Sequence, residues 1–372
     1  MLRTEALIDL AAIRSNVAQL RSRTTAEVMA VVKADGYGHG LVQSAGAAVA
    51  GGAAWLGTAI VEEAVALRRA GFEVPILAWL WTPDETDTVR TAIDNDVDLS
   101  VASRWQLDAV VAQAQILGKP ARVHLKVDTG LSRNGCYADE WPDLVTATVK
   151  ARASGEVEPV GVWSHLAYAD EPGHPTIARQ LSAFTEALRA ARDNGIDPAV
   201  RHIANSAATL TLPEAHFDLV RPGIAVYGLS PVTERFGLLP AMTLRAAAAL
   251  VKRVRAGEGV SYGHDYTTTR RTTLVLVPLG YADGVPRHAS GIGPVWINGS
   301  RFTIAGRVCM DQVVVDVGDL PVAPGDAVVF FGPGRDGEPT AQDWADALGT
   351  IHYEIVTRIG PRVRRQYVGG IE

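Results

Sequence analysis

The chain has few cysteines, no excess of basic residues and no long apolar run. Cys136 and Cys309 are the only cysteines among 372 residues, too few for the disulfide framework of a small secreted domain. The formal net charge of −6 argues against nucleic acid or an anionic membrane as the main partner, because both attract basic surfaces. No apolar stretch is long enough to cross a bilayer, and residues 1–16 carry charges where a signal peptide would be apolar. These absences predict a cytoplasmic protein.

The first part of the chain alternates apolar runs with amphipathic stretches of helical length. A chain of 372 residues exceeds what one hydrophobic core normally serves, so we expect two domains. The apolar runs are Val28–Lys33, Ala54–Ala59, Pro75–Leu80, Val97–Val101, Arg122–Val127, Pro159–His165, Val200–Ala204 and Leu219–Arg221. Because buried parallel strands are apolar on both faces, this alternation predicts a (β/α)8 TIM-type barrel over residues 11–236.

The character of the sequence changes from residue 237 onward. Short apolar runs follow one another, separated by turn sequences such as Gly-Glu-Gly, Asn-Gly and Pro-Gly-Asp. The runs are 244–254, 272–279, 294–297, 301–308, 312–317 and 327–331. We therefore expect a mainly β C-terminal domain over residues 237–372, with one helix near 340–348. The strand expected at residues 1–10 is assigned to this domain.

Lys33 ends the first apolar run and is followed at once by Gly36, Tyr37 and Gly38. Burial of an ammonium group costs several kcal/mol in order of magnitude unless the charge is paired or neutralised. A lysine whose pKa is lowered by burial is a nucleophile, and with a carbonyl compound it forms a Schiff base. The ordinary alternative is a lysine that extends from the strand end into solvent.

Polar residues also follow other strands of the expected barrel, at the carboxyl ends where barrel enzymes carry their catalytic groups. They are Lys126, Asp128, Arg133, His165, Asn205, Ser206 and Arg221. Each could be structural by itself, but together they would surround one face. The loops after the seventh and eighth strands often bind phosphate in this fold, and here they offer the Ser206 hydroxyl and backbone N–H groups near Gly223.

A Schiff-base lysine beside a phosphate site suggests pyridoxal 5'-phosphate as the cofactor. The ring nitrogen of this cofactor needs a protein partner, and Arg221 is placed to be that partner. An arginine leaves the nitrogen unprotonated and the ring a weak electron sink. The expected chemistry is therefore mild proton transfer.

These residues belong to a wider resemblance, since nearly the whole chain resembles the alanine racemases, which are fold-type III pyridoxal-phosphate enzymes. The motifs that carry the resemblance are Ala30–Gly40, Lys126–Arg133, His165, Asn205–Ala208, Arg221–Gly228, Val260–Gly263, Cys309–Asp311 and Tyr353–Glu354. The segment Ile355–Arg362 departs from the family's more usual cysteine-containing tail. That departure concerns the packing of the terminus and leaves the site motifs intact.

The resemblance implies a role for each polar group of the expected barrel. Lys33 would bind the cofactor covalently, Arg221 would contact its ring nitrogen, and His165 would stack against the ring or steer it. Arg133 would reach the cofactor's phenolic oxygen and the substrate carboxylate. The residues implied to hold the phosphate are Tyr37, Ser206, Gly223, Ile224 and Tyr353, and Asn205 is expected to bind the cofactor. No metal is expected.

The resemblance also implies a homodimer. Tyr262, together with the substrate-contacting Tyr281, Met310 and Asp311, would come from the β domain of the second subunit. Racemisation requires a base on each face of the α carbon, and the two bases would be Lys33 and Tyr262. The expected role is interconversion of L- and D-alanine, which supplies D-alanine for peptidoglycan.

Lys126 is expected to be carbamylated. An unmodified ammonium near Arg133 would set two cations together, whereas a carbamate would accept hydrogen bonds from the guanidinium and orient it.

Three alternatives remain open on the sequence. A decarboxylase of the same fold type would have an acidic partner for the ring nitrogen, and Arg221 argues against it. A non-catalytic carrier of the cofactor would leave Tyr262 and the motif at 309–311 unexplained. A racemase for serine or a larger amino acid is the third, although Tyr281 and Tyr353 imply a narrow entrance that favours a methyl group.

Overall fold

The computed structural model describes residues 2–370, which divide into two compact units. The barrel unit comprises Ile13–Gly36 and Leu41–Leu238. The C-terminal unit comprises the residues up to Ala12, the short segment Tyr37–Gly40, and the chain from Leu239 onward. The domain divisions expected from the sequence lie after residues 10 and 236, and the sequence did not suggest that residues 37–40 would group with the C-terminal part.

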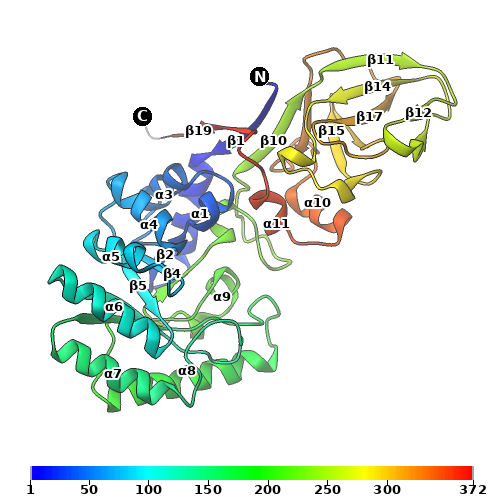
Figure 1. Ribbon diagram of the computed structural model, residues 1–372. Coiled ribbons are helices and arrows are strands. Elements are labelled where there is room, and N and C mark those ends of the chain that lie inside the picture. The colour runs from blue at the N-terminus through cyan, green and yellow to red at the C-terminus, as the bar shows by residue number, and fades with distance from the viewer. Residues whose placement is uncertain (1, 371–372) are drawn as a thin grey trace. The chain divides into compact units, whose positions relative to one another are not determined.

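The barrel unit contains an eight-stranded sheet whose neighbouring strands run parallel, in the order β8-β7-β6-β5-β4-β3-β2-β9 (Figure 1). Its strands are β2 Glu27–Val31, β3 Trp55–Ile60, β4 Ile76–Leu80, β5 Asp98–Val101, β6 Ala121–Lys126, β7 Val157–Trp163, β8 Val200–His202 and β9 Leu219–Val220. Backbone hydrogen bonds join the two end strands, from Arg221 N to Ala204 O at 2.9 Å and from Asp218 N to Arg201 O at 3.1 Å. The expected (β/α)8 barrel is confirmed.

Helices cover the outside of this sheet (Figure 1). They are α3 Leu41–Ala50, α4 Val61–Arg69, α5 Thr86–Asp94, α6 Arg104–Leu117, α7 Trp141–Ala153, α8 Pro175–Asp193 and α9 Ser206–Thr211. In α4 the buried positions Val61, Ala64, Val65 and Leu67 recur at helical spacing and form one apolar face. Helix α6 ends at Gly118, whose φ of 61° is the left-handed conformation that favours glycine at a helix end.

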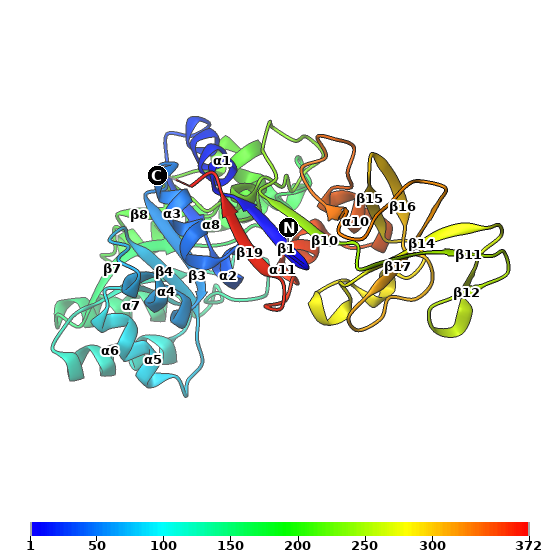
Figure 2. The same ribbon diagram turned by 90° about the horizontal axis from the view of Figure 1, so that it is seen from above.

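The C-terminal unit is built from three sheets. The largest has the strand order β16-β15-β18-β10-β1-β19, the next β11-β14-β17, and the smallest β12-β13. The strands are β1 Thr4–Asp9, β10 Met242–Ala247, β11 Leu250–Val254, β12 Gly259–Val260, β13 Tyr266–Thr267, β14 Thr272–Val277, β15 Pro294–Ile297, β16 Ser300–Thr303, β17 Val313–Gly318, β18 Ala327–Phe331 and β19 Arg364–Val368. Figure 2 shows β1 lying between β10, to which it is antiparallel, and the terminal strand β19, to which it is parallel.

Two expectations about this unit are wrong. The run 244–254 is not one strand, because the chain passes from the six-stranded to the three-stranded sheet between β10 and β11. Ala248 N donates to Asp326 O at 2.8 Å, and the next amide, Ala249 N, donates to Leu276 O at 2.8 Å. No glycine or proline marks the crossing, so the sequence shows no break there. The run 301–308 is a strand only as far as Thr303.

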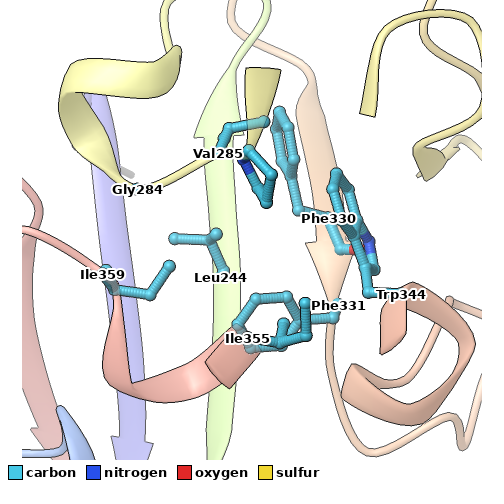
Figure 3. A pocket seen from close by; sticks show the side chains of 9 residues that line it. Leu244, Gly284, Val285, Phe330, Phe331, Trp344, Ile355 and Ile359 are labelled. Atoms are coloured by element: carbon cyan, nitrogen blue, oxygen red, sulfur yellow. The ribbon is translucent and has the colours of Figure 1, made fainter. Parts of the chain in front are cut away.

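Two helices, α10 Ala341–Leu348 and α11 His352–Thr357, precede β19. Helix α10 begins with a capping box, in which Thr340 Oγ1 accepts from Asp343 N at 3.1 Å and Asp343 Oδ2 accepts from Thr340 N at 2.9 Å. A small cavity lies beside both helices (Figure 3), and its lining is Leu244, Gly284, Val285, Pro286, Phe330, Phe331, Trp344, Ile355 and Ile359. Because none of these side chains is ionisable, the cavity offers no group for proton transfer.

Candidate active site

Lys33 stands at the start of a left-handed turn that follows β2. Ala34, Asp35 and Gly36 have φ of 54°, 52° and 61°, a conformation that costs about 1–2 kcal/mol for each residue with a side chain. Glu63, in the first turn of α4, compensates part of that cost because its Oε1 accepts from Asp35 N at 3.0 Å. The lysine is therefore followed by a fixed turn at the carboxyl end of the barrel strands.

Arg133 is presented by a loop that closes on itself after β6. Asp128 Oδ1 accepts from three successive backbone amides, Gly130 N at 2.9 Å, Leu131 N at 3.1 Å and Ser132 N at 3.2 Å. The loop ends are joined by Cys136 N, which donates to Lys126 O at 2.8 Å, and by Asp128 N, which donates to Cys136 O at 2.9 Å. Asp128 thus shapes the loop, and Arg133 itself is exposed.

The structure brings together the residues predicted to bind phosphate after β8 and β9. Ser206 Oγ accepts from Gly223 N at 2.8 Å, which ties the two loops to each other. Ile224, the first residue of the 3-10 turn Ile224–Tyr227, is fully buried. Asn205 is the N-cap of α9, and its side chain accepts from Ala208 N at 3.1 Å. Its amide oxygen is therefore engaged in holding the helix start.

Arg221 is a buried guanidinium held by acceptors at the ends of two strands, β7 and β8. Its Nη1 donates to His202 Nδ1 at 3.1 Å, and its Nη2 donates to Ser164 O at 2.7 Å and to His165 Nδ1 at 3.3 Å. Burial lowers the pKa of Arg221 to about 9. The guanidinium also lies 4.8 Å from the centre of the Trp163 ring, a cation–π contact.

The neighbouring ionisable groups are shifted toward their neutral forms. Burial, with Arg221 and Arg133, lowers the pKa of Lys126 to about 7, and its Nζ lies 4.2 Å from the centre of the Trp163 ring. Burial, with the same two arginines, lowers the pKa of His165 well below its usual value. The pKa of Lys33 is also lowered, by burial and by Arg133, and Glu63 opposes this shift.

The barrel end therefore brings together more basic groups than carboxylates. Arg133 lowers the pKa of Lys33, Lys126 and His165, and Arg221 lowers that of Lys126 and His165. The carboxylates that act on the two lysines, Glu63 and Asp128, are each engaged with backbone amides. Such a site suits an anionic ligand that supplies the missing negative charge.

In the C-terminal unit, three predicted site residues project from neighbouring turns. The exposed fractions are 72% for Tyr262, 42% for Tyr281 and 53% for Met310. Tyr281 N donates to Cys309 O at 3.0 Å, and Cys309 Sγ lies 3.3 Å from the hydroxyl of Ser261, the residue before Tyr262. The turns therefore meet around Cys309 and hold three large side chains toward the surface.

Asp311 belongs to an ion-pair arrangement centred on Arg362. Arg362 Nη2 donates to Asp311 Oδ1 at 2.7 Å, and Arg362 Nε lies 3.2 Å from Asp283 Oδ1. Asp283 is fully buried, and its other oxygen accepts from Gly280 N at 2.9 Å. The guanidinium thus joins the turn that carries Tyr281 to the loop that carries Asp311.

Tyr37 and Tyr353 lie together within the C-terminal unit. Their ring centres are 6.4 Å apart with an angle of 48° between the ring planes. Tyr37 is buried, and burial together with Tyr353 raises the pKa of its phenol above the usual range. The two tyrosines predicted to bind phosphate are thus neighbours, although 316 positions separate them in the sequence.

Sequence reasoning missed several polar residues next to these groups. Asp98, His124 and His202 lie buried on barrel strands, and Glu63 and Arg362 make the contacts described above. A signal was available for the first three, because an ionisable residue within a buried strand must find a polar partner. Glu63 and Arg362 lie on polar stretches of the sequence, where a charged residue is common and does not indicate a specific partner.

Residues 2–370 contain neither a cluster of metal-binding side chains nor a helix that could span a membrane. Within this range no group of three or more His, Cys, Asp or Glu side chains could hold a metal ion. Among the described helices, none has both the length and the apolar character needed to span a membrane.

Comparison with known proteins shows the family. The models of the alanine racemase N-terminal domain and C-terminal domain match residues 8–231 and 241–367. The alanine racemase of Salinispora tropica is 60% identical over 371 residues, which cover 99% of each chain. A crystal structure of alanine racemase from the D-cycloserine producing Streptomyces lavendulae has a TM-score of 0.98 and 57% identity, over 100% of this chain and 98% of that one. The alanine racemase of Bacillus anthracis with bound L-Ala-P has a TM-score of 0.92 and 35% identity, over 100% of this chain and 96% of that one. The chain therefore belongs to the alanine racemase family, a family of isomerases.

Proposed function

We propose that this chain interconverts L- and D-alanine with pyridoxal 5'-phosphate bound at the barrel end. The observation that carries the proposal is the buried Arg221, which donates to His165 beside two lysines of lowered pKa. An arginine at this position suits mild proton transfer and argues against a decarboxylase, which would need an acidic group toward the ring nitrogen.

The residues of the barrel end fit this cofactor, whose phosphate and phenolic oxygens are anionic. The excess of basic groups described above would be balanced by those oxygens. Arg221 would face the ring nitrogen, His165 the ring, and Arg133 the phenolic oxygen and the substrate carboxylate. The phosphate would be held by Tyr37, Ser206, Gly223, Ile224 and Tyr353, and Asn205 would also contact the cofactor. The bound cofactor would withdraw electrons from the substrate and make its α proton acidic.

The chain's own part in the reaction is to move that proton on both faces of the α carbon. Lys33 would serve on one face, and its lowered pKa favours the unprotonated amine that a base requires. The partner subunit's Tyr262 would serve on the other. His165 accepts from Arg221 through Nδ1, so the neutral ring carries its proton on Nε2 and can donate it to a phenolate oxygen.

A homodimer follows from this assignment, because the exposed turns of the C-terminal unit would complete the site of a second chain. The partner subunit's Tyr281, Met310 and Asp311 would contact the substrate there. We further propose a cytoplasmic enzyme that supplies D-alanine for peptidoglycan.

Lys126 is proposed to carry a carbamate. Its unprotonated amine would attack carbon dioxide, forming an N–C bond and releasing one proton to solvent. Because the neutral amine reacts, carbamate occupancy should rise as pH rises through about 7, the lowered pKa of this lysine. Labelled carbon dioxide should give a carbamate carbon signal in the wild type and none in Lys126→Ala. A bare amine in a crystal structure, or unchanged activity of Lys126→Ala, would count against the carbamate.

Racemisation assays on the purified protein test the whole proposal. We expect a yellow protein that racemises L-alanine faster than L-serine or L-lysine, followed by optical rotation. Borohydride should fix the cofactor to Lys33, as shown by peptide mapping, with Lys33→Ala as the control. A protein without a cofactor adduct at Lys33, or one that leaves L-alanine unchanged, would refute the proposed function.

A further inference from the structure

A chain of buried polar side chains runs from Arg221 through the inside of the barrel. Arg221 Nη1 lies 3.1 Å from His202 Nδ1, and His202 Nε2 lies 2.9 Å from His124 Nδ1. His124 Nε2 lies 3.2 Å from Asp98 Oδ2. Asp98 Oδ1 then accepts from Arg122 Nε at 2.7 Å. The two histidines are fully buried and Asp98 is nearly so.

The two ends of this chain determine where each proton lies. A guanidinium can only donate, so His202 Nδ1 must accept and the neutral ring carries its proton on Nε2. That proton makes His124 Nδ1 an acceptor in turn, and His124 then donates through Nε2 to the Asp98 carboxylate. A fully protonated His124 would instead direct an N–H toward His202 Nε2, move the His202 proton to Nδ1, and set two donors against each other at Arg221.

The barrel interior is shaped around these rings. A Cβ built on Gly161 would lie 2.4 Å from His124 Nδ1, so only glycine leaves room for the imidazole. Trp163 stacks on His202 with ring centres 5.5 Å apart and 2° between the planes. Trp163 is itself fixed, because its Nε1 donates to Ser100 Oγ at 3.1 Å. The rings therefore have little freedom to rotate or to exchange hydrogen-bond partners.

We propose that Asp98, His124 and His202 are positioning residues for the racemase reaction, which fix the protonation pattern and the orientation of Arg221 through a one-way chain of hydrogen bonds. The carboxylate of Asp98 is the final acceptor. Because each neutral imidazole then donates through Nε2 and accepts through Nδ1, His202 presents an acceptor to Arg221. Arg221 in turn keeps Nδ1 of His165 occupied and leaves its Nε2–H for other partners. The proposal rests on the proposed function only for the role of Arg221 at the cofactor.

A purely structural role for the same residues makes different predictions. A structural polar cluster would affect stability, and any partner that filled the space would serve. The positioning role requires one pattern of donors and acceptors. If the direction of any one hydrogen bond were reversed, every following bond would reverse as well, and His202 would present a donor to Arg221. Glutamine at position 124 can reproduce that pattern, because its amide oxygen can accept from His202 and its amide nitrogen can donate to Asp98. Leucine at the same position can do neither.

The first experiment is nitrogen NMR of the wild-type holoenzyme labelled with 15N-histidine. The signals of His124 and His202 are identified by their loss in His124→Gln and His202→Gln. We expect both rings to be neutral with the proton on Nε2 near neutral pH. An imidazolium at either position, or a proton on Nδ1, would overturn the proposal without any need for a variant that folds poorly.

The second experiment compares His124→Leu with His124→Gln in the loaded enzyme. We expect His124→Leu to lower kcat by about tenfold or more with little change in KM, and to shift the nitrogen signals of His202 and His165. His124→Gln should restore both the signals and most of kcat, even if thermal denaturation shows it to be no more stable than the leucine variant. Equal kcat in the two variants, or unshifted signals in His124→Leu, would refute the positioning role.

The two proposals can fail separately. A protein that shows the expected histidine protons but neither binds the cofactor nor racemises alanine would refute the proposed function and leave the hydrogen-bond chain standing. An active racemase in which His124 or His202 is protonated differently would refute the hydrogen-bond chain and leave the proposed function standing.

Discussion

Several predicted site residues differ in exposure between the two units. In the barrel unit Lys126, Ser206 and Arg221 are buried, and their positions are set by neighbours on adjacent strands. In the C-terminal unit the backbone of the site turns is fixed, but Tyr262 and Met310 project into solvent. Burial lowers the pKa values of Lys126 and Arg221, whereas exposure leaves Tyr262 and Met310 available to another surface.

This difference indicates which half of the site is complete within one chain. In the barrel half, hydrogen bonds within one chain orient Arg221 and join the two loops that are proposed to bind phosphate. The C-terminal half presents large side chains whose burial would be favourable, at roughly 25 cal/mol per Å² of apolar surface removed from water. A second copy of the chain would satisfy both halves at once, as the proposed homodimer requires.

The largest expected effect comes from dividing the two bases between two chains. Lys33→Ala and Tyr262→Phe should each lose activity by roughly 10²–10⁴-fold or more, because each lacks one base. When the two variants are dissociated and mixed, one site of a mixed dimer regains both bases and activity should return. Each variant carried through the same procedure alone is the control. Mixed dimers that stay inactive would show that Tyr262 does not act across the subunit boundary.

Tyr262→Phe by itself should separate the two faces of the substrate. If the tyrosine takes the α proton from L-alanine and Lys33 takes it from D-alanine, the variant should lose solvent-deuterium exchange mainly with L-alanine, by roughly 10²-fold or more. Exchange is followed by NMR of each enantiomer, with the cofactor absorbance as the control for an intact site. Equal loss with both enantiomers would contradict the division of labour between the two bases.

Gly161→Ala tests how tightly the barrel half is packed. The added methyl group would collide with His124 Nδ1, and overpacking of this kind typically costs about 1–3 kcal/mol of the free energy of unfolding. Gly46→Ala is the matched control, because Gly46 lies in α3, where a new Cβ meets only Phe72 at 3.9 Å. That substitution should be stabilising by about 0.4–1 kcal/mol. Denaturant unfolding measures both changes. An unchanged free energy of unfolding in Gly161→Ala would show that the barrel interior can rearrange to accept the added methyl group.

Arg362→Met tests the looser support of the C-terminal half. It leaves the buried Asp283 without its ion-pair partner, but Arg362 is partly exposed and solvent screens the pair, so we expect only a small loss in the free energy of unfolding. The Asp311 loop should become less ordered, which should raise KM for alanine more than it lowers kcat. Arg362→Lys keeps the positive charge but cannot pair with both carboxylates as the guanidinium does, so its KM should lie between those of the wild type and Arg362→Met. An unchanged KM in Arg362→Met would show that the ion pairs do not position this loop.

The barrel could be predicted because its strands are marked locally. Each apolar run is short, continuous and separated from the next by a helical stretch, and parallel strands buried on both faces leave this pattern in a sequence. The C-terminal unit was harder to predict, because the chain passes from one sheet to another at Ala248 and Ala249 without glycine, proline or another turn residue. Strand β19 has mainly exposed residues and no apolar alternation, so only its pairing with β1 identifies it.

The site residues likewise divide into those that the local sequence marks and those that only the structure reveals. Lys33, Lys126 and Arg221 could be selected because a charged residue at the end of a buried strand is unusual. The capping function of Asn205 and the contact between Glu63 and Asp35 depend on local geometry that a residue type does not specify.

The sequence by itself determined the alternation that makes a barrel, the change to a β-rich second part, and the motifs that identify the family. The tertiary structure alone decided which buried polar groups meet. His124 and His202 are 78 positions apart, and they touch because β6 and β8 both pair with β7, His124 opposite Gly161 and His202 opposite Trp163. Arg362 reaches Asp283 and Asp311 for a similar reason, since the chain returns past turns formed much earlier. A hydrogen bond or ion pair acts over a few ångströms, and sequence separation carries no information about that distance until the strands have paired.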